Sequence, residues 1–326
     1  MGADCAKIQR VTRQKFLEQR ADGSDSMHIV TLGSGTGQAT LLRGLRPYAC
    51  EVTAIVGVTD NGGHSGQLRR LLHQPQVGDT RQCLSALLDP TSLWGHLLSQ
   101  RFTEGELSGV SVGNMMLAAL TQRYGGLSAA VEAVCQAAGA SQRVLPVSDG
   151  DAQIGAELQD GRRVIGEWEI IKRQPRSPVV RLFLSPPVAA HQTVLDAVAQ
   201  ADVLVFCPGS FLTGTIALLL HPGMPGALAA SQALCVYICN LMTQAGQTDG
   251  YTTQQHLDTL QQYLGRRIEV LVLNNAPLPP DLVALYAQHE ARPVAHTLTS
   301  RDITVYQADL VERPELGLAL LRQHLR

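Results

Sequence analysis

Two glycine-rich segments of this chain carry the residue types that could bind a phosphorylated ligand. The first, GSGTG at 33–37, follows an apolar, β-branched run at 28–32 and precedes a segment with helical spacing at 39–45. The second, DNGGHSG at 60–66, follows the apolar run 52–58. Glycines at a strand-to-helix turn let backbone N–H groups approach a ligand, and the helix N-terminus adds the positive end of its dipole. The pattern predicts a phosphate site built largely from backbone amides.

The spacing of the first segment differs from the common nucleotide fingerprints. The dinucleotide motif G-x-G-x-x-G would place its third glycine at Gln38, whereas Gly37 comes one residue early. The chain has no G-x-x-x-x-G-K-[ST] P-loop, and neither Ser65 nor Ser210 lies in a G-x-S-x-G elbow. Taken alone, the first turn is also compatible with a tight connection that holds no ligand. The second segment favours a binding site, and no catalytic residue is predicted.

The two segments must be positioned by parallel strands joined through a crossover helix, which brings both to one edge of a sheet. Further apolar runs that end in polar or glycine turns occur at 203–206, 234–239 and 268–273, with helical patterns at 193–200, 211–220 and 254–264. This rhythm predicts an α/β fold with a doubly wound, mostly parallel, Rossmann-like sheet. We expect one nucleotide-binding domain over 27–326, preceded by a flexible extension at 1–26.

Residues 144–187 have a different character and predict a small β-rich insertion. Two strand-like stretches, at 152–158 and 162–171, flank an Asp160-Gly161 turn that is typical of a hairpin. A loop with several arginines and prolines follows, and then a further strand pattern at 179–186. We interpret the basic cluster as a solvated face.

Composition excludes several classes of protein. The 326 residues are 45% hydrophobic with a formal net charge of −2, so no general attraction to nucleic acid or anionic lipid is expected. The seven cysteines include no C-x-x-C pair and suit a reduced, cytoplasmic setting. The apolar stretch 203–220 is interrupted by Pro208 and Gly209, and residues 1–26 lack the apolar core of a signal peptide. We expect no membrane association.

The order of the motifs GSGTG, TDNGGHSGQLR, GDTRQCL, VGN, CPGSFLTGTI, NLMTQAGQTDGYT and VLVLNNAP resembles the gluconeogenesis factor family (the YvcK type), within the 2-phospho-L-lactate transferase (CofD-type) superfamily. The resemblance runs from residue 27 to the C-terminus. It implies a cytoplasmic protein that binds a nucleoside-diphosphate sugar such as UDP-N-acetylglucosamine and supports cell shape and wall synthesis during gluconeogenic growth. The transferase branch instead joins a phospholactyl group to a deazaflavin alcohol with a metal held by aspartate.

The chain departs from the family pattern at three places. It has Asp60-Asn61 where relatives usually carry two aspartates, His64-Ser65 where they usually carry two serines, and Val110-Ser111-Val112 where they commonly have a histidine a few residues before the Gly-Asn motif. The missing carboxylate weakens a Mg²⁺ site, since Mg²⁺ is normally held by carboxylates plus phosphate oxygens. This disfavours transferase chemistry and leaves amide-based nucleotide binding intact.

From these patterns we assign expected roles. Phosphate-binding residues are expected to be Gly33, Ser34, Gly35, Thr36, Gly37, Gly62, Gly63, His64, Ser65, Arg81, Gly209, Ser210 and Thr213. Base- or sugar-binding residues are expected to be Asp60, Asn61, Asn114, Asn240, Thr243, Gln244 and Asn274. Asp60 is also the candidate ligand for Mg²⁺, the one cofactor considered, although it could simply cap its turn. Asp79 or Thr80 could cap the helix that starts near 79 or contact the ligand, and Arg69 is a weaker candidate than Arg81.

Two functional hypotheses follow. In the first, the protein is a non-catalytic nucleotide-sugar sensor that regulates a partner protein; in the second, it is a metal-dependent transferase acting on a nucleotide-activated donor. A dehydrogenase, with Asp60 on a ribose hydroxyl, is the remaining alternative. A homodimer is also considered, because the apolar content is high.

Overall fold

A parallel β-sheet forms the centre of the protein. The computed structural model describes residues 27–46, 51–300 and 302–311, so the predicted extension at 1–26 lies outside the described part. Within that part, seven parallel strands form one sheet in the order β10-β9-β8-β7-β1-β2-β3. The strands are β1 (His28–Gly33), β2 (Glu51–Val56), β3 (Arg143–Pro146), β7 (Val203–Phe206), β8 (Leu234–Ile238), β9 (Val270–Asn274) and β10 (Thr304–Ala308). The predicted α/β, doubly wound fold class is confirmed.

The strand order reverses at β1, which lies between β2 and β7. In the register of these three strands, Leu32 is paired with Ile55 on one side and with Phe206 on the other. The carboxyl ends of the three strands therefore lie side by side at the same edge of the sheet. In doubly wound folds, ligands bind at this reversal of strand order. The fold thus places both predicted glycine-rich segments and the turn after β7 at the expected position.

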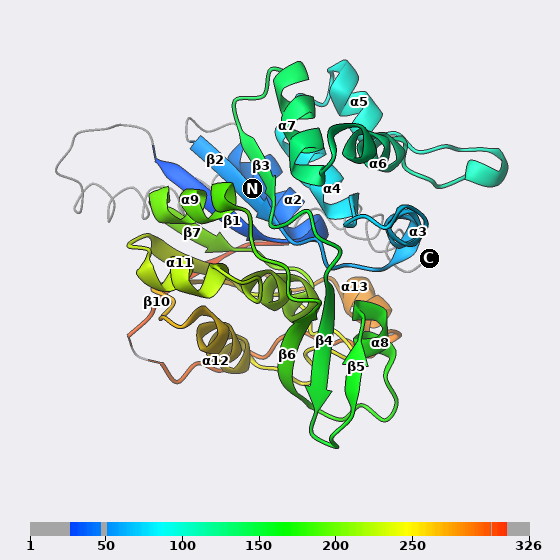
Figure 1. Ribbon diagram of the computed structural model, residues 1–326. Coiled ribbons are helices and arrows are strands. Elements are labelled where there is room, and N and C mark those ends of the chain that lie inside the picture. The colour runs from blue at the N-terminus through cyan, green and yellow to red at the C-terminus, as the bar shows by residue number, and fades with distance from the viewer. Residues whose placement is uncertain (1–26, 47–50, 301, 312–326) are drawn as a thin grey trace.

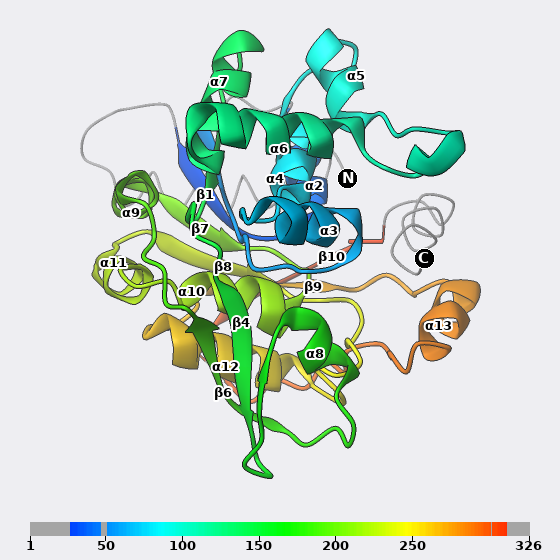
Figure 2. The same ribbon diagram turned by 45° about the vertical axis from the view of Figure 1, so that its right-hand side comes forward.

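Helices cover both faces of the large sheet (Figures 1 and 2). The helices of one layer are α2 (Gly35–Leu45), α4 (Gly78–Leu87), α5 (Leu93–Ser99), α6 (Val112–Tyr124) and α7 (Leu127–Ala137). Those of the other are α9 (Gln192–Gln200), α10 (Ala217–Leu219), α11 (Met224–Ala230) and α12 (Thr253–Leu264). Further connecting elements are α3 (Gly63–Leu72), η1 (Gly105–Leu107) and α13 (Pro280–Ala287). The inner strands β1, β2, β7, β8 and β9 read as largely apolar runs because both of their faces are buried.

A separate antiparallel sheet projects from the body (Figure 1). It consists of β4 (Gln153–Leu158), β5 (Arg163–Ile165) and β6 (Val179–Ser185), in the order β5-β4-β6. The predicted Asp160-Gly161 hairpin turn is present. Because β3 belongs to the large sheet, the antiparallel sheet occupies 153–185, a shorter segment than the predicted 144–187.

The second strand of that predicted hairpin is wrong beyond Ile165, because the next residues form a helix. Gly166 has φ +113°, which ends β5, and α8 (Glu167–Lys172) begins directly after it. Its first turn carries Glu167 and Glu169, and acidic side chains favour a helix N-terminus. α8 packs against β4 and β5 and faces the body of the protein.

The segment after β7 begins with a π-helical stretch, η2 (Phe211–Ile216), which runs into α10. π-helical turns are rare and frequently occur at functional sites.

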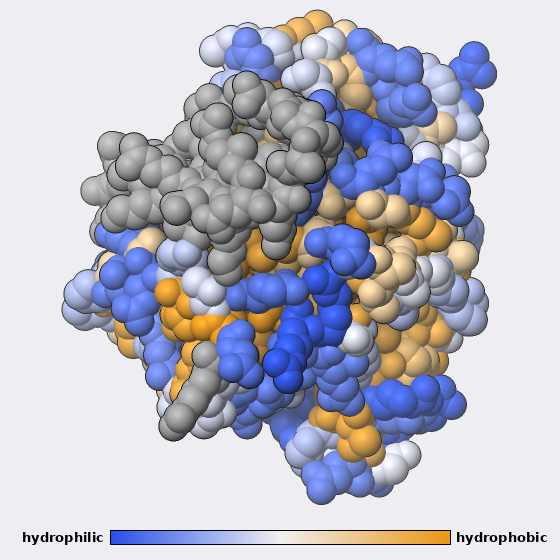
Figure 3. All heavy atoms as spheres, turned by 90° about the vertical axis from the view of Figure 1, so that its left-hand side faces the viewer, coloured by the Kyte–Doolittle hydropathy of each residue, from blue (hydrophilic) through white to orange (hydrophobic). Residues whose placement is uncertain are grey.

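In the described residues no single helix is long and apolar enough to cross a bilayer. The helices 211–219 and 224–230 have the required length and apolarity only when they are taken together, and the chain bends by 77° between them. The face shown in Figure 3 alternates hydrophilic and hydrophobic groups.

Candidate functional site

The turn after β1 and the turn after β7 are in direct backbone contact. A side chain at Gly37, in the first turn of α2, would place its Cβ 1.9 Å from the Pro208 carbonyl oxygen. A Cβ at Gly209 would lie 3.2 Å from the Ser34 carbonyl oxygen, and one at Gly214 would lie 2.2 Å from the Ser34 hydroxyl. The two predicted phosphate-binding turns are thus brought together at the reversal of strand order.

The N-terminus of α2 points its amides toward this junction. Ser34 is the N-cap residue, and its side chain makes no capping hydrogen bond. Gly35 has φ +61°, a conformation that favours glycine, and its amide donates to the Asp79 carboxyl. A helix N-terminus without a side-chain cap is suited to hold an anion. Asp79 occupies part of that position from α4.

The second glycine-rich segment turns at Gly62 and becomes α3 at Gly63. The Asp60 carboxylate accepts the Gly62 N–H at 2.7 Å, so the local capping role considered for Asp60 is real. Behind it, the Arg69 guanidinium is 4% exposed and donates to the backbone carbonyls of Thr59, Asp60 and Ala152. Arg69 therefore braces the segment from within instead of facing a ligand.

Ser65 and His64 are the other polar residues of this segment that were predicted to bind phosphate. The Ser65 hydroxyl donates to the Gly62 carbonyl and lies against Gly78, next to Asp79. His64 lies in the first turn of α3, and its side chain is outside the described part of the structure.

Three carboxyl groups from separate parts of the chain gather beside the α2 N-terminus. Glu167 of α8 hydrogen-bonds Asp60 and accepts a bond from the Thr213 hydroxyl at 2.7 Å. Burial, and then the neighbouring Asp60 charge, raise the pKa of the Glu167 carboxyl well above its ordinary value. The same two causes raise the pKa of Asp79 to about 8. Carboxyls with raised pKa values keep their protons to higher pH, which reduces the negative charge around the site.

This arrangement predicts the behaviour of an Asp79→Asn variant. The unfolded chain releases the Asp79 proton near pH 3.8, whereas the folded protein keeps it up to about 8, so the Asp79 contribution to stability falls as the pH rises between these values. Relative to the wild type, the variant is expected to gain about 3–4 kcal/mol of unfolding free energy between about pH 5 and pH 8. Urea unfolding of both proteins at the two pH values measures this. A difference that does not change with pH would contradict it.

The predicted capping role of Asp79 or Thr80 in α4 is wrong. Neither side chain caps the helix, whose N-cap residue is Val77. Instead the Gln76 side-chain oxygen accepts the N–H groups of Gly78 and Asp79, at 2.6 and 3.3 Å. The Asp79 carboxyl is thereby left to face Gly35.

The amides of the turn after β7 are largely satisfied by the chain itself. Asn240 exchanges two hydrogen bonds with the backbone of Gly209. Gln244 accepts the Phe211 N–H, and Gln247 accepts those of the next two residues. Asn240 and Gln244, predicted to contact base or sugar, therefore shape this turn, and Ser210 is left as its polar member facing the α2 turn.

The remaining predicted residues fall into two groups. Arg81 donates to Asn114 at 2.9 Å, both are buried behind Asp79, and burial lowers the pKa of Arg81 to about 10. Thr243 and Asn274 lie further out, at the ends of β8 and β9. Thr243 exchanges bonds with the Arg292 backbone, and Asn274 closes its own turn, two strands from β7.

Asn61 connects the second glycine-rich segment to the antiparallel sheet. Its side chain accepts the Trp168 N–H and donates to Glu169, each at 3.2 Å. Thr36 bonds Gln82 through its hydroxyl.

Glu167 and Gln247 belong to the site although the sequence pattern does not reveal them. The only signal for Glu167 is an acidic residue directly after Gly166. In the described residues no group of three or more His, Cys, Asp and Glu side chains forms a metal-ligand set. A Mg²⁺ ion on Asp60 would therefore need phosphate oxygens or water as its other ligands.

The known proteins that are similar to this chain point to one family. The family model described as 2-phospho-L-lactate transferase CofD matches residues 29–311. A putative gluconeogenesis factor from Thermotoga maritima is 39% identical over 261 residues, which cover 80% of this chain and 82% of the relative. A gluconeogenesis factor from Bacillus subtilis is 35% identical over 300 residues, covering 91% and 90%. The crystal structure of a UPF0052 family protein from Bacillus halodurans matches with a TM-score of 0.84 and 34% identity, covering 92% of this chain and 100% of that one.

The chain therefore belongs to the CofD family. Its curated relatives within that family are gluconeogenesis factors, which confirms the resemblance predicted from the motif order.

Proposed function

We propose that this protein binds a nucleoside-diphosphate sugar of the UDP-N-acetylglucosamine type and acts as a regulatory gluconeogenesis factor, not as an enzyme. In this proposal it works in the cytoplasm. Ligand loading governs a partner protein, and through it cell shape and wall synthesis during gluconeogenic growth. The names of the relatives support the gluconeogenic setting.

One observation carries the ligand class: the α2 N-terminus, which its own N-cap residue Ser34 leaves without a side-chain cap, lies at the reversal of strand order, with the Asp79 carboxyl on the Gly35 amide. The turn after β7 contacts this turn directly, and Ser65 of the second glycine-rich segment lies against Gly78, next to Asp79. A pyrophosphate suits this position because it is bound by backbone amides and a helix dipole. The nucleoside and sugar would then extend along the carboxyl edge of the sheet, toward Asn61 and toward the turn after β8.

The second candidate function is a metal-dependent transferase that uses a nucleotide-activated donor. The observation in its favour is the gathering of Asp60, Asp79 and Glu167 beside the α2 N-terminus. Carboxylate oxygens suit Mg²⁺, which would neutralise a pyrophosphate held there. Because the pKa values of Asp79 and Glu167 are raised, Mg²⁺ binding at these carboxyls would displace protons and would strengthen as the pH rises.

Isothermal titration calorimetry and thermal unfolding with UDP-N-acetylglucosamine, GDP and NAD, each with and without Mg²⁺, test these alternatives. We expect the uridine ligand to bind without metal and, at one hundred times its Kd, to stabilise the protein by about 2.7 kcal/mol. Free N-acetylglucosamine is the control and should have no effect. Stabilisation only by GDP with Mg²⁺ would favour the transferase, and stabilisation only by NAD would favour a dehydrogenase.

A further inference from the structure

α8 connects the antiparallel sheet to three loops at the carboxyl edge of the large sheet. At its N-terminus, Trp168 and Glu169 bond Asn61 of the loop after β2. On its inner side, Glu167 bonds Thr213 of the segment after β7. These contacts come from chain segments that are far apart in sequence, so α8 joins loops that the large sheet alone would leave separate.

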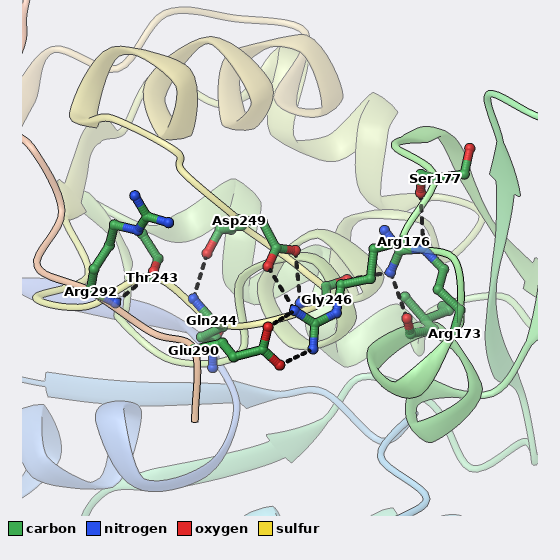
Figure 4. Close-up of polar contacts among 11 residues, drawn as sticks. Arg173, Arg176, Ser177, Thr243, Gln244, Gly246, Asp249, Glu290 and Arg292 are labelled. Carbon is green, nitrogen blue, oxygen red and sulfur yellow. Dashed lines mark hydrogen bonds and ion pairs between the residues drawn. The ribbon is translucent and has the colours of Figure 1, made fainter. Parts of the chain in front are cut away.

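The C-terminal end of α8 makes the third connection, to the loop after β8 (Figure 4). Arg173 is buried and donates to the carbonyls of Ile170, Ser177 and Gly246. Gly246 has φ +77°, and a side chain there would place its Cβ 2.2 Å from the Ile171 carbonyl oxygen. The loop therefore rests directly on the α8 backbone.

A neighbouring group of ion pairs also holds the loop after β8 in place. Arg176 makes a two-pronged bond to Glu290, at 2.7 and 2.9 Å, and lies 3.5 Å from Asp249 (Figure 4). The loop held here also carries Gln244, whose side chain accepts the Phe211 N–H. Movement of α8 would therefore reach the segment after β7 by two routes, through Glu167 directly and through the loop after β8.

We propose that α8 is a wall of the ligand site that responds to its occupancy, with Glu167 as the positioning residue that transmits the change to the antiparallel sheet. This inference rests on the proposed function and adds how loading is signalled. Glu167 contacts both Asp60 and Thr213, two residues expected to face the ligand. A pyrophosphate beside Asp60 competes for the contacts of the Asp60 carboxylate and so alters its hydrogen bond with Glu167. A ligand shifts a conformation only through such a differential contact.

Trp168, on the outer side of α8, can report a movement of this helix through its fluorescence. Trp168 is 51% exposed, its backbone N–H donates to the Asn61 side chain, and the Lys172 ammonium lies 4.2 Å from its ring centre. Any displacement of α8 changes the solvent exposure of this indole and its contact with Lys172. The chain has one other tryptophan, Trp94 in α5, on the opposite layer of helices.

The test combines Trp168 fluorescence with calorimetry in the full-length chain, using UDP-N-acetylglucosamine as the probe. In a Trp94→Phe background, we expect a saturable change in Trp168 emission with the same midpoint as the calorimetric Kd. Glu167→Ala should weaken binding by about tenfold and abolish the emission change at saturation, since the hydrogen bonds of Glu167 to Asp60 and Thr213 are lost. Glu167→Gln keeps an acceptor for Thr213 and should restore the response.

Two controls and three outcomes make the test decisive. Trp168→Phe, which retains Trp94, should show no emission change, and Glu157→Gln on the outer face of the antiparallel sheet should respond like the parent. Calorimetric binding without a Trp168 change would overturn the inference and leave the proposed function standing. A full response in Glu167→Ala would also overturn it. Absence of calorimetric binding would overturn the proposed function, and this inference with it.

Discussion

Replacing Arg69 by alanine is expected to lower the free energy of unfolding by about 3–5 kcal/mol. The Arg69 side chain is buried and supplies donors to three backbone carbonyls and to the Asp151 carboxylate at 2.6 Å. Its removal leaves these carbonyls buried without a partner, which costs the full desolvation of each group. Chemical unfolding followed by circular dichroism measures the loss.

The adjacent residue provides a matched control. Arg70 is in the same helix turn but is exposed, and its replacement by alanine should change stability by less than about 0.5 kcal/mol. Because Arg69 also holds the carbonyls of Thr59 and Asp60, ligand binding by Arg69→Ala should weaken even where the protein remains folded. Equal stabilities of the two variants would show that the Thr59–Asp60 segment does not depend on this brace.

A Gly37→Ala variant is expected to lose about 2–3 kcal/mol of stability and to bind ligand at least about tenfold more weakly. The added Cβ would lie 1.9 Å from one backbone atom of Pro208 and 2.7 Å from another, so α2 must move away from the turn after β7. That movement separates the two turns that form the site. Thermal unfolding and calorimetric titration measure the two effects.

Gly226 offers the comparison for this substitution. It also lies in a helix, α11, and a Cβ added there meets nothing within 4 Å. Gly226→Ala should therefore leave binding unchanged and stabilise the protein by up to about 1 kcal/mol, the difference in helix propensity. If Gly37→Ala behaved in the same way, the close contact between the two turns would be wrong.

Much of the large sheet could be predicted because its strands are buried on both faces. The runs that become β1, β2, β7, β8 and β9 are continuously apolar, and each is followed by a polar or glycine turn. The edge strand β10 alternates between exposed and partly buried residues, so its sequence pattern is weak and predicts no strand there. β3 was placed in the insertion because nothing in so short a strand identifies its partner.

The site could be predicted where it depends on glycine and not where it depends on side-chain partners. Gly35 and Gly37 are needed for a positive φ and a close approach, and sequence spacing reveals such constraints. Asn240 and Gln244 have side chains suited to a sugar, yet here they bond the chain's own amides. The side-chain amide is the same whether it binds a sugar or the protein backbone, so only the fold shows which of the two it does. Glu167 was missed because its burial depends on α8 docking against residues far away in sequence.

The central position of β1 also governs how this protein emerges during synthesis. One edge of β1 pairs with β2 soon after both are made, but the other edge receives β7, which ends at Phe206. Until then one edge of β1 lacks its partner strand and can pair with a wrong segment or with another chain. The incomplete sheet of the growing chain therefore depends on residues made late, and a fragment truncated before β7 is expected to aggregate rather than to form a smaller working protein.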